Sequence, residues 1–166
     1  MENLLLLLAG SLVLRLSSTD RRPDHRIKDT GCSVLLYGKQ PLTHRRTPTG
    51  DHVYLHECSE GPVGYGMICI AMKSRYSLDT ATGMLSSYME KLKGPFAVFH
   101  SAGAATEADW NSTDSSSLVD YWQDASGADW KVKGYTNGRF LAVLYVSNIN
   151  EADSARQDQF LDSFHF

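Results

Sequence analysis

The sequence predicts an α+β fold, in which a mostly antiparallel β-sheet is packed with helices as an α/β/α sandwich. Residues 118–146 contain three extended segments separated by two turn signals. Residues 78–92 repeat apolar side chains with the period of a helix, and a short helical segment closes the chain. Groups of strands that alternate with single helices are typical of an antiparallel sheet covered by helices.

The chain has the length and composition of one globular domain. Its 166 residues are 42% hydrophobic and 21% charged, which are ordinary values for a domain with a hydrophobic core. The formal net charge of -3 gives no general electrostatic reason to bind nucleic acid, and we expect no nucleic-acid partner. We divide the chain into an apolar N-terminal segment with a polar linker, residues 1–26, and a single α+β domain, residues 27–166.

Residues 4–14 form an apolar run that is shorter than the roughly twenty residues needed to span a bilayer. A secretory signal or anchor is one interpretation, although Glu2 precedes the run where signals carry a basic residue and no clear cleavage site follows. A native helix or strand is the other interpretation. The localisation therefore stays open, with an extracytoplasmic place slightly favoured, and we expect membrane association only through this run.

Four strands are predicted in the first half of the domain. Residues 32–37 form a short strand, and residues 42–47 form an edge strand, each followed by a turn rich in glycine and proline. Residues 53–58 and 63–72 flank a Ser-Glu-Gly-Pro turn and predict a hairpin with a longer loop.

The second hairpin strand carries two glycines on one face. Gly64 and Gly66 alternate with Tyr65 and Met67, so the glycines share the face of Ile68. Paired glycines inside a strand indicate either a helix packed close to that face or a bend in the sheet.

Residues 78–92 predict the clearest helix of the chain. Ser77 or Asp79 can cap its start, and Gly94 with Pro95 ends it. Its apolar side chains recur at three and four residues, so they form one stripe that must lie on the sheet. The stripe consists of Leu78, Ala81, Leu85, Tyr88 and Leu92.

A strand is predicted at residues 96–100, and a long loop at residues 101–117. The loop is rich in small and polar residues and has no clear period. Long ordered loops often carry functional sites.

The strand at residues 140–146 is the predicted centre of the sheet. Asn137 and Gly138 before it favour a tight hairpin turn, because both tolerate positive φ. Both alternating sets of side chains in the strand are apolar, which indicates a strand covered on both faces. Asn150 then resembles the cap of a last helix. We expect its inward side chains to be Ala152, Ala155, Phe160 and Phe164.

Three stretches resemble the PsbP-like superfamily, and in particular its small bacterial exported relatives. Residues 32–41 are similar to the opening strand and turn of the family, residues 138–146 to a later strand, and residues 158–164 to the "F-x-x-S-F" end of the last helix. Tyr37 departs from the pattern, since a proline is common there. The resemblance implies a PsbP-like sandwich over residues 27–166, and a binding or assembly role without a shared catalytic set.

The cysteines and histidines do not indicate a metal or cofactor site. Cys32, Cys58 and Cys69 are too few for a disulfide framework, so buried free thiols are expected, with one disulfide as the alternative. His52 and His56 lie on one face of a strand, but about 13 Å apart at strand spacing. They cannot bind one ion without a bulge, so we expect no metal and no cofactor.

Aromatic side chains gather in the long loop and the strands after it. Trp110, Trp122, Trp130 and Tyr121 are our candidate ligand-binding or partner-binding residues, because such aromatics are enriched at recognition surfaces. Packing in the core is the alternative explanation for them.

Two functions follow as hypotheses. The first is a non-enzymatic PsbP-like binding or assembly domain that recognises a protein partner or a small ligand on a sheet edge or on the 101–117 loop. The second is a small enzyme or ligand-pocket protein of the α+β cone type, with His56, His100 or Asp120 in a cavity lined by the sheet. No catalytic residue is assigned, since no nucleophile or base stands in a recognisable motif.

Overall fold

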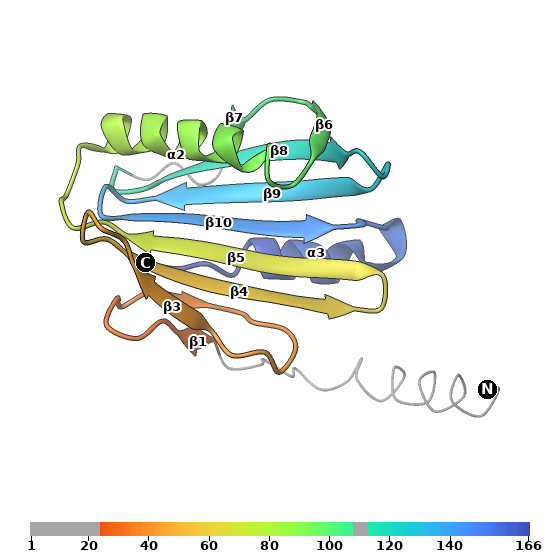
Figure 1. The fold of residues 1–166 in the computed structure, drawn as a ribbon, viewed down its shortest axis with the longest axis horizontal. Coiled ribbons are helices and arrows are strands. Elements are labelled where there is room, and N and C mark those ends of the chain that lie inside the picture. The colour runs from red at the N-terminus through yellow and green to blue at the C-terminus, as the bar shows by residue number, and fades with distance from the viewer. Residues whose placement is uncertain (1–23, 108–112) are drawn as a thin grey trace.

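A computed structural model describes residues 24–107 and 113–166. The apolar run at residues 4–14 and the candidate residue Trp110 lie outside the described residues. The described chain forms an α+β sandwich, mostly sheet, with a helix on each face (Figure 1).

One antiparallel sheet carries the fold. Its strands follow the order β3-β4-β5-β10-β9-β8-β6, and β7 pairs with β8 beside β6. The strands are β3 (Thr43–Arg46), β4 (His52–Glu60), β5 (Val63–Ala71), β6 (Val98–Ser101), β7 (Ala105–Thr106), β8 (Ser116–Asp124), β9 (Asp129–Thr136) and β10 (Phe140–Ser147). The predicted hairpin is confirmed as β4 and β5, and the predicted three-strand meander as β8, β9 and β10.

The two helices cover opposite faces of the sheet. Helix α2 (Leu78–Leu92) lies on the face that we call the front, against β8, β9 and β10. Helix α3 (Ser154–Leu161), preceded by the 3₁₀ turn η2 (Glu151–Asp153), lies on the back face (Figure 1). The short ladder of β1 (His25–Arg26) and β2 (Ser33–Val34) belongs to the segment that covers the rest of the back.

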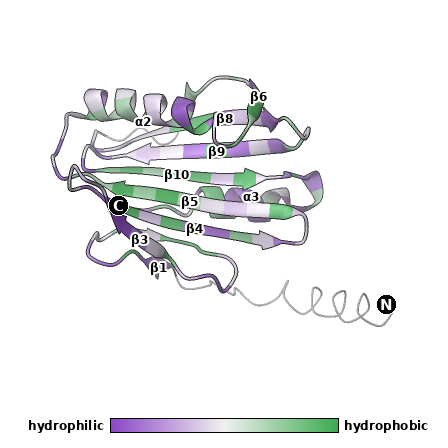
Figure 2. Cartoon of the chain, in the orientation of Figure 1, coloured by the Kyte–Doolittle hydropathy of each residue, from purple (hydrophilic) through white to green (hydrophobic). Residues whose placement is uncertain are grey.

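β10 is the central strand, as predicted. All residues from Phe140 to Val146 are buried, because β5 and β9 pair with β10 on its two edges and a core lies on each face. Leu144 belongs to the back core with Phe160, and Val143 belongs to the front core with Leu85. Hydrophobic residues accordingly concentrate on β5 and β10 in the middle of the sheet (Figure 2).

The N-terminal part of the domain differs from the prediction in two details. The strand predicted at residues 32–37 is confined to Ser33–Val34, and Cys32 precedes it. His25–Arg26, which we assigned to the linker, pairs with this strand as β1. The reason is that Ile27 is an apolar residue buried in the back core and holds the neighbouring backbone against the sheet.

The three cysteines are buried free thiols, which is the first of the two alternatives that the sequence left open. The Cys32 thiol lies in hydrogen-bond contact with that of Cys69, in the core between β5 and the segment of β2. This hydrogen bond, together with burial, raises the pKa of Cys69 well above its usual value.

Helix α2 begins where it was predicted. The Ser77 side-chain oxygen accepts a hydrogen bond from the backbone N–H of Thr80 at 3.3 Å. The buried residues of the helix are Ala81, Leu85, Met89 and Leu92. Leu78 and Tyr88, which we placed on the buried stripe, are only partly covered.

The close approach between helix and sheet occurs at Gly134 of β9. A Cβ atom there would lie 2.8 Å from the Met89 sulfur and 3.0 Å from a methyl carbon of Leu85. Of the two alternatives for Gly64 and Gly66, the close helix is wrong, because the atoms nearest these glycines belong to Ser147 and Tyr145 of β10. The helix lies mainly over β8, β9 and β10, and its side chains reach β5 at Ile68 and Ile70.

The loop predicted at residues 101–117 is shorter than expected. β7 pairs with Val119 and Leu118 inside this range, and β8 already begins at Ser116. The last helix also differs in part. Asn150 caps the 3₁₀ turn η2 that leads into it, and both phenylalanines, Phe160 and Phe164, are fully buried. Ala152, which lies in the 3₁₀ turn, and Ala155, which lies in the first turn of α3, are exposed.

The turn before β10 needs glycine. Gly138 has φ +82°, and a Cβ atom at this position would overlap the backbone carbonyl oxygen of Tyr76. Replacing Gly138 by Ala should lower the free energy of unfolding by about 2 to 3 kcal/mol, from left-handed strain and the backbone clash together. The matched control is Gly83→Ala in α2, where a Cβ meets nothing within 4 Å.

Urea denaturation of both variants tests this prediction. Gly83→Ala should raise stability by about 0.5 to 1 kcal/mol, because alanine is the better helix former. Equal effects of the two substitutions would show that the turn does not have the described conformation.

Candidate functional site

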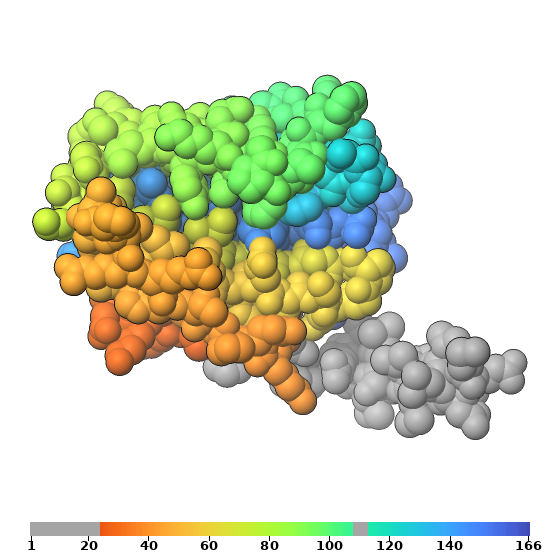
Figure 3. Space-filling model, in the orientation of Figure 1, coloured from red at the N-terminus to blue at the C-terminus, as the bar shows by residue number. Residues whose placement is uncertain are grey.

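Half of the front face has no helix over it. α2 lies mainly over β8, β9 and β10, so the front side of β4 and part of that of β5 are left open beside the helix, while Ile68 of β5 is buried. Apolar side chains that are only partly buried line this opening. They are Val53, Leu55, Ile70, Met84 and Tyr88, and we call the opening between α2 and β4 the front groove. Figure 3 shows it as a hollow between α2 and the β3–β4 side of the molecule.

One end of the front groove is an apolar hollow of about 600 Å³. Ile70, Met72 and Leu141 from the sheet and Met84 and Tyr88 from α2 supply its apolar lining. Burial raises the pKa of the Tyr88 hydroxyl, which therefore stays protonated at neutral pH.

Asp51 stands at the rim of this apolar hollow. One oxygen of its carboxylate accepts a hydrogen bond from the Lys73 backbone N–H at 2.8 Å, and the other accepts one from the Thr49 hydroxyl at 2.8 Å. The Lys73 hydrogen bond is the main reason why the pKa of Asp51 is lowered. Asp51 therefore holds the rim of the hollow as an ionised, hydrogen-bonded group.

The other end of the front groove is a more polar hollow of about 450 Å³, which we call the Glu57 hollow. The Glu57 carboxylate accepts a hydrogen bond from the Tyr145 hydroxyl across the intervening strand β5. Burial, and after it the hydrogen bond and charge of Glu57, raises the pKa of Tyr145 well above its usual value. Tyr145 thus remains a neutral donor. The lining residues are Gln40, Glu57, Cys58, Ser59, Gly64, Tyr65, Trp130, Tyr145 and Ser147.

The two glycines of β5 explain how Tyr145 reaches Glu57. In the sheet register Gly66 lies between Glu57 of β4 and Tyr145 of β10. A Cβ atom on Gly66 would overlap the Tyr145 ring, and one on Gly64 would overlap the Ser147 hydroxyl. The glycines therefore make room for side chains that cross from β10, and not for a helix.

Trp130 and Tyr145 line one side of the Glu57 hollow, and Phe96 packs against both rings. The Tyr145 ring centroid lies 4.9 Å from that of Phe96 and 5.7 Å from that of Trp130, and Phe96 and Trp130 are 5.1 Å apart. Phe96 follows α2 in the chain, so the end of the helix brings it over the sheet. Such contacts fix the positions of the Trp130 and Tyr145 rings on the lining.

Asp124 anchors the indole of Trp130. Trp130 Nε1 donates to Asp124 Oδ2 at 2.9 Å, while Asp124 Oδ1 accepts from the Ser126 hydroxyl at 2.6 Å. These hydrogen bonds, the one from Ser126 first, lower the pKa of Asp124 to about 2. The contact thus holds one wall of the Glu57 hollow through a short loop.

The Asp124 contact makes a testable pH prediction. Because the folded-state pKa lies below the ordinary value of about 3.9, the stabilising effect of Asp124 is present above that value and is lost as the pH falls through about 2. A carboxyl-carbon NMR titration should give a midpoint near 2, and Ser126→Ala should raise it. An unchanged midpoint in that variant would contradict the assigned cause.

The structure separates the four aromatic residues that the sequence proposed as a site. Trp130 lines the Glu57 hollow. Trp122 pairs with Trp130 across β8 and β9 but is buried, and its Nε1 donates to Asp120 at 2.6 Å. Core packing therefore explains Trp122. Tyr121 is 48% exposed and belongs to the opposite face, where Lys131 lies 5.9 Å from its ring centroid. Trp110 lies outside the described residues.

The three residues named for the cavity of an enzyme are not brought together. His56 is buried on the back face, where its Nε2 lies 2.8 Å from the Tyr37 carbonyl oxygen. His100 is exposed on β6. Asp120 is buried on the front face, and both its oxygens accept from the Ser101 hydroxyl.

Glu57 and Tyr145 are the groove residues that sequence reasoning missed. Tyr145 lies in a strand that is apolar on both faces, and Glu57 belongs to no recognisable motif in β4. The paired glycines were the signal for this pair, because they mark the strand that both side chains cross.

Comparisons with known proteins identify no relative whose site could be compared with this one. No family model matches the chain, and no curated protein matches it. Among residues 24–107 and 113–166, no group of three or more His, Cys, Asp or Glu side chains is placed to hold a metal ion. Over the same residues, no helix has the length and apolar character needed to cross a membrane.

Proposed function

We propose that this chain is a non-enzymatic binding domain that recognises a small ligand or a protein partner in the front groove. The observation that carries the proposal is the open part of the front face, where partly exposed apolar side chains from α2, β4 and β5 lie beside a hollow. Figure 3 shows the hollow between α2 and the β3–β4 side. Apolar surface of this kind, rimmed by polar groups, marks interaction sites in soluble proteins.

The two hollows of the groove fit the general properties of ligand sites. Their volumes, about 600 and 450 Å³, lie in the range of small-molecule pockets. Apolar floor supplies contact area, and a few polar groups at the ends, Asp51 at one and Glu57 at the other, would orient what binds.

A PsbP-like membership stays part of this proposal. Its support is the arrangement of two of the three resembling stretches, which pack on one another. The Ser163 hydroxyl of the "F-x-x-S-F" stretch accepts a hydrogen bond from the Leu35 backbone N–H at 3.0 Å and donates to the Phe160 carbonyl at 2.7 Å. These residues lie on the back face, so they act in the fold and leave the front groove free for binding.

A fragment screen with a blocked variant tests the function. Met84→Arg places a long charged side chain at the groove while keeping a good helix former, so fragments that bind wild type should lose about tenfold or more in affinity. Val119→Arg on the opposite face of the sheet is the matched control and should leave binding unchanged.

Two results would oppose the proposal. One is a screen in which no fragment binds the wild-type chain. The other is binding that Val119→Arg removes and Met84→Arg leaves intact. Thermal unfolding of both variants beforehand shows that each is folded.

A further inference from the structure

The Glu57 hollow combines one free acid with aromatic walls. Glu57 is exposed, and within the described residues no lysine, arginine or histidine forms an ion pair with it. The Tyr145 hydroxyl donates a hydrogen bond to Glu57, and because it is a neutral donor it leaves the negative charge uncompensated. The hollow therefore presents a net negative group to whatever enters it.

The walls of the hollow favour an organic cation. Trp130 and Tyr145 both line it, and aromatic rings attract ammonium groups through their electron-rich faces. The Ser59 and Ser147 hydroxyls add oxygen acceptors on the same lining. A hard metal ion needs several oxygen ligands, more than one of them usually a carboxylate. One carboxylate beside aromatic rings instead suits a weakly hydrated ammonium group.

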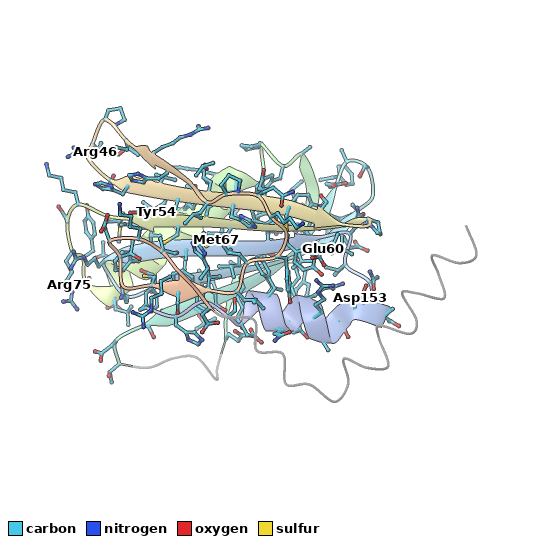
Figure 4. The ribbon with its side chains drawn as sticks, turned by 90° about the horizontal axis from the view of Figure 1, so that it is seen from below. Arg46, Tyr54, Glu60, Met67, Arg75 and Asp153 are labelled. Carbon is cyan, nitrogen blue, oxygen red and sulfur yellow. The ribbon has the colours of Figure 1, made fainter. Side chains whose placement is uncertain are left out.

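The charged side chains labelled in Figure 4 separate along the molecule. The labelled acids Glu60 and Asp153 lie at the end of the molecule that holds this hollow, and the labelled arginines Arg46 and Arg75 lie at the opposite end (Figure 4). Glu60 is paired with Arg156 and adds no net charge there, so the negative charge on the lining of the hollow is that of Glu57. A negative charge inside a hollow attracts cations.

We propose that the Glu57 hollow binds the ammonium group of a small organic ligand, with the apolar part of that ligand lying along the groove floor toward Ile70. The Glu57 carboxylate would pair with the ammonium charge, and Trp130 and Tyr145 would contact its alkyl substituents. This proposal rests on the proposed function, since it names the class of ligand that the same groove takes.

The experiment compares two probes of equal shape and different charge. Choline carries a trimethylammonium group, and 3,3-dimethylbutan-1-ol carries a neutral tert-butyl group in its place. Nitrogen–proton correlation spectra of the full chain should show shifts for the Trp130 indole and the Gly64 and Gly66 amides with choline. The neutral probe should bind about tenfold more weakly or worse, because it lacks the charge that Glu57 and the rings attract.

Variants assign the charge effect to Glu57. Glu57→Gln keeps an oxygen that accepts the Tyr145 hydroxyl, so the fold is preserved while the charge is removed. Choline affinity should fall about tenfold in this variant. Glu151→Gln is the matched control, since Glu151 is an exposed acid outside the lining of the hollow, and it should leave the affinity unchanged.

Equal binding of the two probes, no response of the hollow to choline, or equal choline affinity of wild type and Glu57→Gln would each overturn the ammonium assignment. If fragments still bind the groove and Met84→Arg still blocks them, the proposed function stands while its ligand class falls. If no fragment binds either, the proposed function fails as well.

Discussion

Replacing Asp120 by Ala should lower the free energy of unfolding by about 3 to 5 kcal/mol, one of the two largest effects that we expect. The Asp120 carboxylate is fully buried and is the shared acceptor of a polar cluster. It accepts from the Ser101 hydroxyl, the Trp122 indole and the Tyr121 backbone, and Lys93 Nζ lies 3.4 Å away. Its removal leaves buried donors without an acceptor, and this costs more than the contact itself contributes.

Urea denaturation measures the cost of Asp120→Ala, and Asp120→Asn gives a graded comparison in that experiment. The amide keeps one oxygen for Trp122 and Ser101 but loses the charge near Lys93, so its cost should lie between those of wild type and Asp120→Ala. A decrease of less than about 1 kcal/mol in the free energy of unfolding for Asp120→Ala would show that water reaches the Asp120 carboxylate, and would contradict its burial.

Replacing Phe160 by Ala should cost about 3 to 5 kcal/mol, because the truncation leaves a large cavity in the back core. Phe160 is fully buried, and its ring centroid lies 5.3 Å from that of Tyr65 and 5.7 Å from that of Tyr37. It joins α3 to β5 and to the segment that follows β2, so the surrounding groups cannot all move inward to fill the space.

Phe99→Ala is the matched control for this cavity. The same atoms are removed from a side chain that is 84% exposed on β6, so stability should change by less than about 0.5 kcal/mol. Urea denaturation of the two variants measures the difference. Similar costs for both would contradict the packing of α3 on the sheet.

Local patterns were sufficient to predict most of the elements. The hairpin at β4 and β5, helix α2 and the meander ending in β10 each have a period or turn signal in the sequence. Apolar residues on both alternating faces of residues 140–146 predicted the central strand, because only a strand covered twice keeps such a composition.

The site depends on pairings that no local pattern encodes. Gly66 lies beside Tyr145 only because β5 and β10, far apart in the sequence, are neighbours in the sheet. The paired glycines of β5 left two alternatives open, a helix packed close to their face or a bend in the sheet. In the structure the close approach is at Gly134, where the missing side chain lets α2 pack directly on β9. The front groove beside the helix therefore stays open.

The roles of the aromatic residues also could not be predicted from local sequence patterns. Trp122 and Trp130 are equivalent in the sequence, each in a strand and near an aspartate. In the fold Trp122 is covered and tied to Asp120, while Trp130 stands at the edge of the cover and lines a hollow. Position relative to the end of α2, and not residue type, separates the core residue from the groove residue.

The central claim is that the front groove is where this domain binds its ligand. Methyl-labelled NMR of the chain with a bound fragment tests this most directly, through nuclear Overhauser contacts between the ligand and side-chain methyl groups. We predict contacts to Leu55, Ile70 and Met84. Contacts that gather instead on the back face, around α3, would contradict the account.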